Sequence, residues 1–146
     1  MDPERHKSLM EELTSITTTV EERRKIGHEV LRQLLLSNPN LMKVFRPIQS
    51  MTLPQALNSS YLGQLSIKFV DSLLEVVRNY NDQDVLRQTI IQLANIHKNR
   101  GITVAHFVAV IPLFTDTLAS FLHIEENKES LQEVLTTILP MIGKRL

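Results

Sequence analysis

The chain contains no cysteine, and this absence excludes two classes of site. Neither a disulfide framework nor a thiolate metal site can form without it. Zinc binding through histidine is disfavoured as well, because no two of the five histidines stand at the spacing of ligands on one helix. No nucleophile–histidine–acid arrangement is discernible, so the sequence gives no support to a hydrolytic triad.

An excess of charge and long apolar runs are also lacking. Sixteen basic and sixteen acidic side chains cancel, and no Lys/Arg stripe is present, which argues against a nucleic-acid partner. No stretch approaches the length of a membrane span, and the N-terminus has no apolar signal region. We therefore expect one cytoplasmic domain over residues 1–146. The sequence leaves open a homodimer and attachment to a larger, for example membrane-attached, protein.

Alternation with a period of two is nearly absent, whereas apolar residues recur with a period near 3.6, so the sequence predicts an all-α fold. The predicted helices span about 3–19, 21 onward, 39–45, 60–79, 84 to near 101, 103–123 and 127–144. Pro47 and Pro54 predict a connector with little regular structure over 46–59. We expect Pro112 to bend its helix and Pro140 to bend or fray the last one.

Two features of the helices point to specific contacts. Gly27 stands inside the second helix, where glycine costs about 1 kcal/mol relative to alanine, so another backbone is expected to cross closely there. Leu86, Ile90, Leu93 and His97 share one helical face, so an imidazole ends an apolar stripe before Gly101. Taken alone, this pattern is typical of a half-buried histidine with a partner.

In order and spacing the chain resembles the globin family, in particular its invertebrate, nematode-type branch. The residues that carry the resemblance are a glycine of the second helix, a proline and a phenylalanine after it, a histidine and the segment that follows: Gly27, Pro39, Phe45, His97 and 102–107. The resemblance covers nearly the whole chain. It implies seven to eight helices packed three over three around haem b. It also implies that the second and fifth helices of the family cross closely. In this chain these are the helix that contains Gly27 and the helix over 60–79, so Gly27 would meet Ser66.

Under this resemblance His97 is the metal ligand. Its second ring nitrogen should donate a hydrogen bond to the carbonyl of Leu93, which fixes the ring. Ile102, Phe107 and Val110 would contact the cofactor from the next helix. Ile96 stands where the family often has serine, so one propionate contact is expected to be missing.

The other four histidines are not expected to bind iron. His6 and His123 lie near predicted helix ends and should be solvated. His28 should point away from the face of Leu31, and His106 precedes the inward Phe107.

On the opposite side, the resemblance places Leu65, Leu31 and Phe69 around the ligand position, with Phe45 and Ile48 closing the wall. None of these side chains donates a hydrogen bond, so the binding free energy of oxygen lacks a contribution of about 1.5–3 kcal/mol. This argues against long-term oxygen storage, whereas neutral carbon monoxide and nitric oxide depend less on a donor. An alternative register would put Gln64 or Ser66 over the iron, and Gln64 would restore a donor.

Two basic residues border this predicted site, and each has more than one interpretation. Lys68 is either a solvated lysine, a partner of a haem propionate, or a catalytic group that binds iron or attracts an anion such as nitrite. Arg100 is either a propionate partner or a surface arginine.

The preferred interpretation is a haem-binding globin that responds to redox state or to diatomic gases. Its versions are sensing of O2, NO or CO, electron transfer, and nitrite reduction supported by an unidentified reductase. One alternative is a reversible oxygen carrier or store. Another, from a different class, is a haem-free globin-fold interaction module in which His97 is structural.

Overall fold

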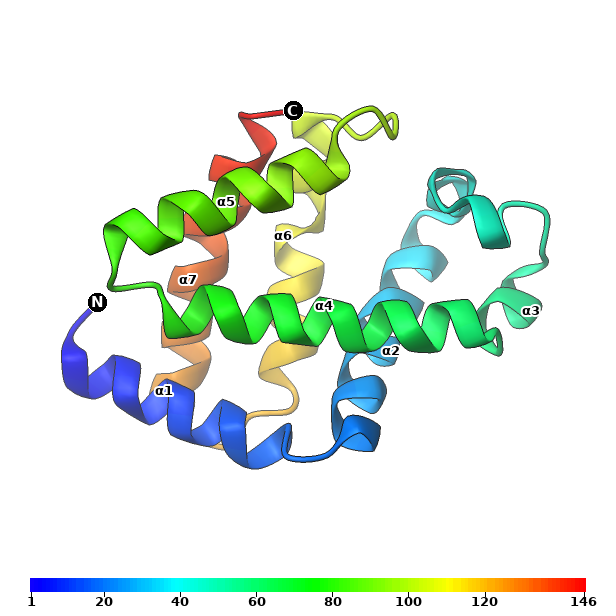
Figure 1. The fold of residues 1–146 in the computed structure, drawn as a ribbon. Coiled ribbons are helices and arrows are strands. Elements are labelled where there is room, and N and C mark those ends of the chain that lie inside the picture. Colours follow the sequence, from blue (N-terminus) through cyan, green and yellow to red (C-terminus); the bar gives the residue numbers. More distant parts are fainter.

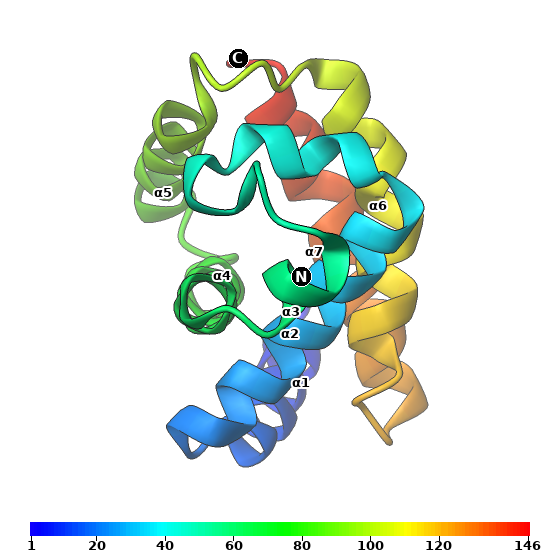
Figure 2. The same ribbon diagram turned by 90° about the vertical axis from the view of Figure 1, so that its right-hand side faces the viewer.

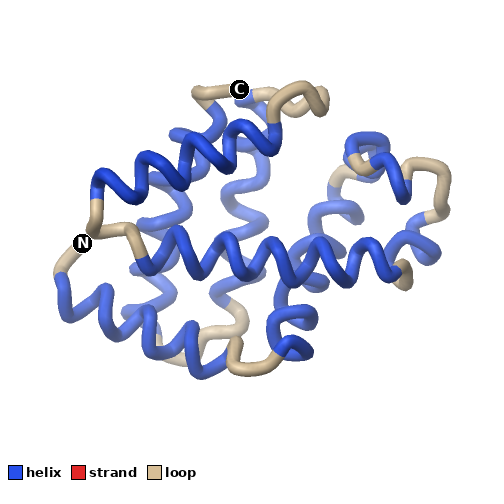
Figure 3. Tube along the Cα trace, viewed as in Figure 1, coloured by secondary structure: helices blue, strands red, loops and turns tan.

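The computed structural model describes all 146 residues and is entirely helical (Figure 3). In chain order the elements are α1 (Pro3–Ile16), α2 (Val20–Ser37), the 3₁₀-helices η1 (Pro39–Val44) and η2 (Arg46–Ile48), α3 (Leu53–Leu57), α4 (Ser60–Arg78), α5 (Gln83–His97), α6 (Val104–Ala119) and α7 (Glu125–Gly143). None of the helices combines the length and apolar composition that crossing a lipid bilayer requires. The predicted all-α fold is confirmed.

The long helices form two layers that cross each other. In Figure 1, α1, α4 and α5 lie in front of α2, α6 and α7, and Figure 2 shows α4 and α5 to one side of the second set. Between the layers α4 packs against α2, while α1 and α5 pack against α7. Within the rear layer α6 packs against both α7 and α2. This is the three-over-three arrangement that the resemblance implied.

The crossing of α2 and α4 depends on Gly27. A Cβ atom at this position would lie 2.1 Å from the carbonyl oxygen of Ser66, which is backbone and cannot move aside alone. Ser66 is itself fully buried, and its hydroxyl donates to the carbonyl of Leu62 at 2.7 Å. The expected close approach at Gly27, with Ser66 opposite, is therefore confirmed.

Several helix ends differ from the prediction. Helix α1 stops at Ile16 rather than Thr19, because Thr19 leaves the helix to cap α2 in a reciprocal pair with Glu22. Helix α6 ends at Ala119 rather than His123, and α7 starts at Glu125. Both Pro112 and Pro140 lie inside helices that continue past them.

The connector over 46–59 was predicted with too little structure. It contains η2 and α3, and each proline stands in the first turn of its helix, where a missing N–H costs no backbone bond. Thr52 and Gln55 cap α3 reciprocally. Proline here starts helices and does not exclude them.

The buried apolar side chains divide into two clusters. The first joins α1, α4, α5, α6 and α7 with the start of α2, and its members include Leu9, Val30, Val70, Ile90, Phe107, Leu131 and Ile138. The second lies at the other end of the molecule and consists of Leu31, Leu34, Leu35, Met42, Ile48, Ala56 and Leu62. The last helix buries the predicted residues Leu131, Val134, Leu135, Ile138 and Ile142.

Polar contacts from α1 fix the position of α7. The buried carboxylate of Glu12 accepts hydrogen bonds from the backbone N–H of His123 (2.7 Å), the Asn127 amide (2.9 Å) and the N–H of Ile124 (3.3 Å). Burial alone would raise the pKa of Glu12, but these bonds outweigh it and hold the pKa below its ordinary value of 4.5. Glu12 thus holds the two residues that precede α7 and the Asn127 side chain in its first turn, whereas the N-cap residue Ile124 offers no side-chain cap.

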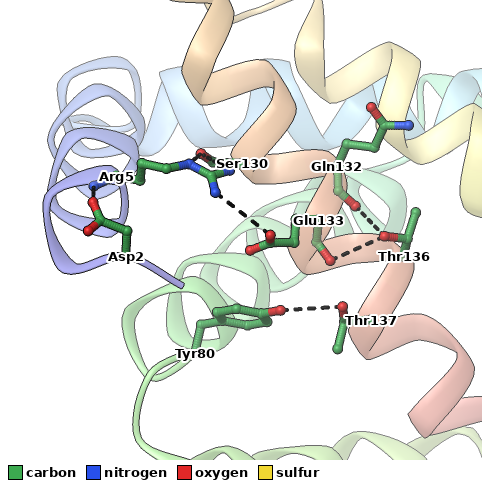
Figure 4. A network of polar contacts seen from close by, with 8 residues as sticks. All are labelled: Asp2, Arg5, Tyr80, Ser130, Gln132, Glu133, Thr136 and Thr137. Atoms are coloured by element: carbon green, nitrogen blue, oxygen red, sulfur yellow. Dashed lines mark hydrogen bonds and ion pairs between the residues drawn. The ribbon is translucent and has the colours of Figure 1, made fainter.

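A second set of contacts ties α7 to α1 and to the residues after α4 in the opposite layer (Figure 4). The Arg5 guanidinium of α1 donates to the Ser130 hydroxyl at 3.0 Å and lies 3.8 Å from the Glu133 carboxylate. After α4, the Tyr80 hydroxyl donates to the Thr137 hydroxyl at 3.3 Å. The elements that carry the candidate site are therefore held in a fixed frame.

Candidate functional site

Between the two core clusters lies a set of apolar side chains that are only half-buried. Those packed on the first cluster include Phe69, Leu93, Ile102, Ile111 and Phe114, and those packed on the second include Phe45, Tyr61, Leu65, Val110 and Phe114. They come from α4, α5, α6 and the segments beside η1 and α6. Large apolar side chains left partly exposed on the inner sides of helices indicate a face suited to a further apolar group. We call this set of residues the inter-cluster face.

The imidazole of His97 is held at the end of α5. Its Nδ1 lies 2.6 Å from the carbonyl oxygen of Leu93, one turn earlier. A carbonyl only accepts, so Nδ1 carries the proton and the lone pair of the neutral ring lies on Nε2. His97 makes no other hydrogen bond within the chain. The predicted hydrogen bond to Leu93 is confirmed, and it leaves one ring nitrogen able to bind a metal.

The chain leaves the helix immediately after His97. Lys98 is extended (ψ 148°), and Asn99 and Gly101 both adopt left-handed backbone conformations, with φ of 64° and 74°. The helix was expected to reach Gly101, but it ends earlier because Asn99 also tolerates this conformation. His97 is consequently the last helical residue, at the rim of the inter-cluster face.

Helix α6 approaches the imidazole through Phe107. The two rings are 5.2 Å apart and nearly perpendicular, at 82°. Farther along α6, Val110, Ile111 and Phe114 follow Phe107 at helical spacing but are only half-buried. The helical spacing of apolar residues over 103–123 predicts that all three, together with Phe107, Leu118 and Phe121, are buried. Only Phe107 and Leu118 are, so this prediction is too strong.

On α4, burial shows which residues face inward. Ser66 is buried against α2, Leu65 and Phe69 are half-buried, and Gln64 is exposed. Phe69 contacts Phe114 edge to face, with ring centroids 5.4 Å apart. The alternative register, which would place Gln64 over the iron, is therefore not supported by the burial of these residues.

Three predicted site residues belong to the second cluster or its edge. Leu31 is buried and Ile48 is fully buried (0% exposed), both inside the cluster on which Leu65 packs. Phe45 is half-buried and contacts Tyr61, with ring centroids 6.5 Å apart. Leu31 and Ile48 thus support the inter-cluster face, while Phe45 belongs to it.

The two basic candidates lie outside this face. Lys68 is exposed on α4 and Arg100 is exposed in the turn after α5, and neither forms an ion pair within the chain. Ile96 is 54% exposed. The structure therefore gives no contact that selects among the interpretations of Lys68 and Arg100.

Three of the remaining histidines hydrogen-bond to the backbone of the chain, and the fourth is exposed. His6 was expected to be solvated, but it is half-buried and its Nε2 lies 2.6 Å from the carbonyl oxygen of Val77. This partner lies 71 residues away in sequence, so no local pattern predicts it. His28 Nε2 lies 2.8 Å from the carbonyl oxygen of Leu57, His106 accepts from the N–H of Thr103 in the cap of α6, and His123 is exposed.

Sequence reasoning missed Phe114, Ile111 and Tyr61 as members of this face. Phe114 and Ile111 could have been found, because they continue the helical spacing that starts at Phe107. Tyr61 stands four and eight residues before Leu65 and Phe69, so the same argument would have found it on α4. Its contact with Phe45 depends on the fold of the connector and has no signal in the sequence.

The residues present fit a planar apolar cofactor with a metal at its centre. One imidazole nitrogen is free to bind, and apolar surface from three helices is available around it. No cluster of three or more His, Asp or Glu side chains exists that would hold a bare metal ion. Two surface hollows, one on α1 and one beside α2, are lined mainly by polar residues and do not include His97. The donor set, a single imidazole within apolar surroundings, is that of a haem site.

Comparison with known proteins gives a consistent result. The family model described as "Globin" matches residues 28–142. A protein named "Globin" from Isoparorchis hypselobagri is 24% identical over 140 residues, which is 95% of this chain and 94% of that protein. Among solved structures, a "hexacoordinated heme protein from anhydrobiotic tardigrade" at pH 4 superposes with a TM-score of 0.82 at 16% identity. That match covers 99% of this chain and 94% of the other.

Proposed function

Because this chain belongs to the globin family and is a haem-binding globin, we propose that His97 binds the iron and that the site serves redox or gas-responsive chemistry. The small ligands would be neutral diatomic gases. The observation that carries the proposal is the hydrogen bond from His97 Nδ1 to Leu93, because it directs the lone pair to Nε2. A neutral imidazole held in this way is the ligand that haem iron requires.

The side chains of the inter-cluster face would hold the group. Phe69, Leu93 and Phe114 offer apolar surface from three different helices, and covering that surface is favourable at about 25 cal/mol per Å². Haem b is the form to expect, because covalent attachment of haem uses cysteines and the chain has none. When bound, the iron supplies a centre that exchanges small ligands and takes up or releases one electron.

The surroundings of a small ligand would be apolar on the side of α4. Leu65 and Phe69 carry no donor, and the exposed Gln64 does not face them. These side chains add no affinity for a polar ligand that depends on a hydrogen bond. A neutral diatomic ligand loses little affinity from the absence of a donor. This supports gas sensing or electron transfer over an oxygen carrier or store.

Nitrite reduction is the enzymatic version of this proposal. It would need an electron from a reductase, together with two protons. The exposed Lys68, which has no acidic partner, gives an anion a favourable approach along α4. Its role would be attraction from solvent, since the side chain is exposed and lies outside the inter-cluster face.

Haem titration of the wild-type protein, His97→Ala and His123→Ala tests the assignment. His123 is the matched control because its side chain is exposed and makes no hydrogen bond. Wild type and control should develop the same Soret band, while His97→Ala should bind at least about tenfold more weakly, as even second-shell losses cost 10- to 100-fold. Added imidazole should restore its spectrum.

Two results would contradict this assignment. Unchanged binding by His97→Ala would exclude His97 as the ligand. Absence of any Soret band in the wild-type protein would instead favour a haem-free interaction module.

A further inference from the structure

The buried end of α7 lies close to the side chain that contacts His97. Gly143 is the last residue of α7, and a Cβ atom there would lie 3.3 Å from the Cβ of Phe107 and 3.6 Å from the Cα and Cγ1 of Val104. The first of these distances is tighter than ordinary van der Waals contact, so Phe107 would have to move. The absence of a side chain at Gly143 therefore sets how closely Phe107 of α6 approaches α7.

Phe107 in turn limits the orientation of the imidazole. The hydrogen bond to Leu93 holds one edge of the ring but still allows small rotations of the ring about the Cβ–Cγ bond. The Phe107 ring, 8% exposed and nearly perpendicular to the imidazole at 5.2 Å, restricts this rotation. Together the two contacts determine the direction of Nε2.

We infer that Gly143 is a positioning residue for His97 and acts through Phe107. This inference rests on the proposed function, in which Nε2 binds iron. It connects the end of α7 to the last residue of α5 through the start of α6, although Gly143 is far from the other two residues in sequence. A larger side chain at position 143 would tilt the imidazole without touching it.

The test compares Gly143→Ala with Gly63→Ala, a glycine of α4 at which a Cβ would make only ordinary contacts, at 3.6 and 3.7 Å, with the flexible Arg24 side chain. Both variants replace a helical glycine by alanine, so they share the gain in helix propensity. In the haem-free protein, the NMR resonances of the His97 ring protons report the Phe107 ring current. In the reduced haem-loaded protein, the iron–histidine stretching band reports the orientation of the ring.

Both signals should shift in Gly143→Ala and stay at the wild-type values in Gly63→Ala. Phe107→Leu should shift them as well, and adding Gly143→Ala to Phe107→Leu should give no further shift, because the coupling passes through the aromatic ring. A purely structural role for Gly143 would lower the unfolding temperature and leave both signals unchanged.

Two outcomes separate this inference from the proposed function. Unchanged signals in Gly143→Ala, with normal haem uptake, would overturn the inference alone. An iron–histidine band that persists in His97→Ala would overturn the proposed function. If Gly143→Ala fails to fold, Phe107→Leu decides: an unshifted His97 resonance in this variant overturns the inference.

Discussion

At the scale of single residues, the chemistry of the site depends on which atoms face the imidazole. One ring nitrogen of His97 is hydrogen-bonded to Leu93 and the other is free, so only Nε2 can bind a metal. On α4 the residues that could have changed this chemistry point elsewhere: Gln64 and Lys68 are both exposed. The apolar Leu65 and Phe69 remain on the inward side, and neither side chain can serve as a second internal ligand.

We therefore expect the reduced haem-loaded protein to show one broad visible band, which indicates an open sixth position. Replacing Lys68 by alanine should leave that spectrum unchanged, because its side chain is exposed and lies outside the inter-cluster face. Absorption spectra of the wild type, Lys68→Ala and the exposed-lysine control Lys25→Ala measure this. Sharp split bands that vanish only in Lys68→Ala would make the lysine an internal ligand and contradict the expectation.

At the scale of elements, the site depends on how closely helices approach. The α2–α4 crossing at Gly27 and Ser66 sets the rotation of α4, and therefore turns Leu65 and Phe69 inward and Gln64 outward. The hydrogen bonds of Glu12 at the start of α7 have a comparable role, since they fix the helix that carries Gly143. Helix packing thus determines which side chains reach the inter-cluster face.

Gly27→Ala should destabilise the protein by about 3 kcal/mol, the upper range for overpacking a core, because the new methyl group would meet a backbone oxygen at 2.1 Å. Gly63→Ala, with ordinary contacts only, should be neutral or stabilising by up to about 1 kcal/mol. Urea denaturation of the haem-free variants gives both values. Equal stability of the two variants would show that the α2–α4 approach is looser than described.

At the scale of the whole molecule, the division of the core has an energetic consequence. The two clusters are each well packed, but the inter-cluster face between them leaves large apolar side chains half-exposed. Such surface contributes less to folding than it would if covered. A group that binds this face only in the folded state adds its binding free energy to the stability of the protein.

Haem should therefore raise the stability of the folded protein by about 2.7 kcal/mol when free haem is 100-fold above its dissociation constant. Denaturation midpoints of the wild type with and without haem measure the gain, and His97→Ala under the same conditions should show a smaller one. Identical midpoints for the loaded and haem-free wild type would mean that haem does not bind preferentially to this fold.

Much of this molecule follows from local patterns in the sequence. The period of 3.6 gave the all-α fold, and Gly27, misplaced by propensity, correctly indicated a close crossing. The bond from His97 to Leu93 was predictable because both residues lie on one helical face, four residues apart. These features depend on neighbours within one or two turns, and in such cases the sequence is sufficient.

Other features depend on partners that are remote in the sequence. The half-burial of Phe114, the contact of Phe107 with both His97 and Gly143, and the partner of His6 all arise where separate helices meet. The end of α1 differs from the prediction for a similar reason: the helix stops before Thr19 because Thr19 caps α2. By itself the sequence determined the helices and most of their inward faces, because the hydrophobic period is local, and His97 became the candidate iron ligand through the resemblance of the whole chain to a family. Only the tertiary structure decided which inward residues stay half-exposed, because that depends on how far apart the packed helices hold their faces.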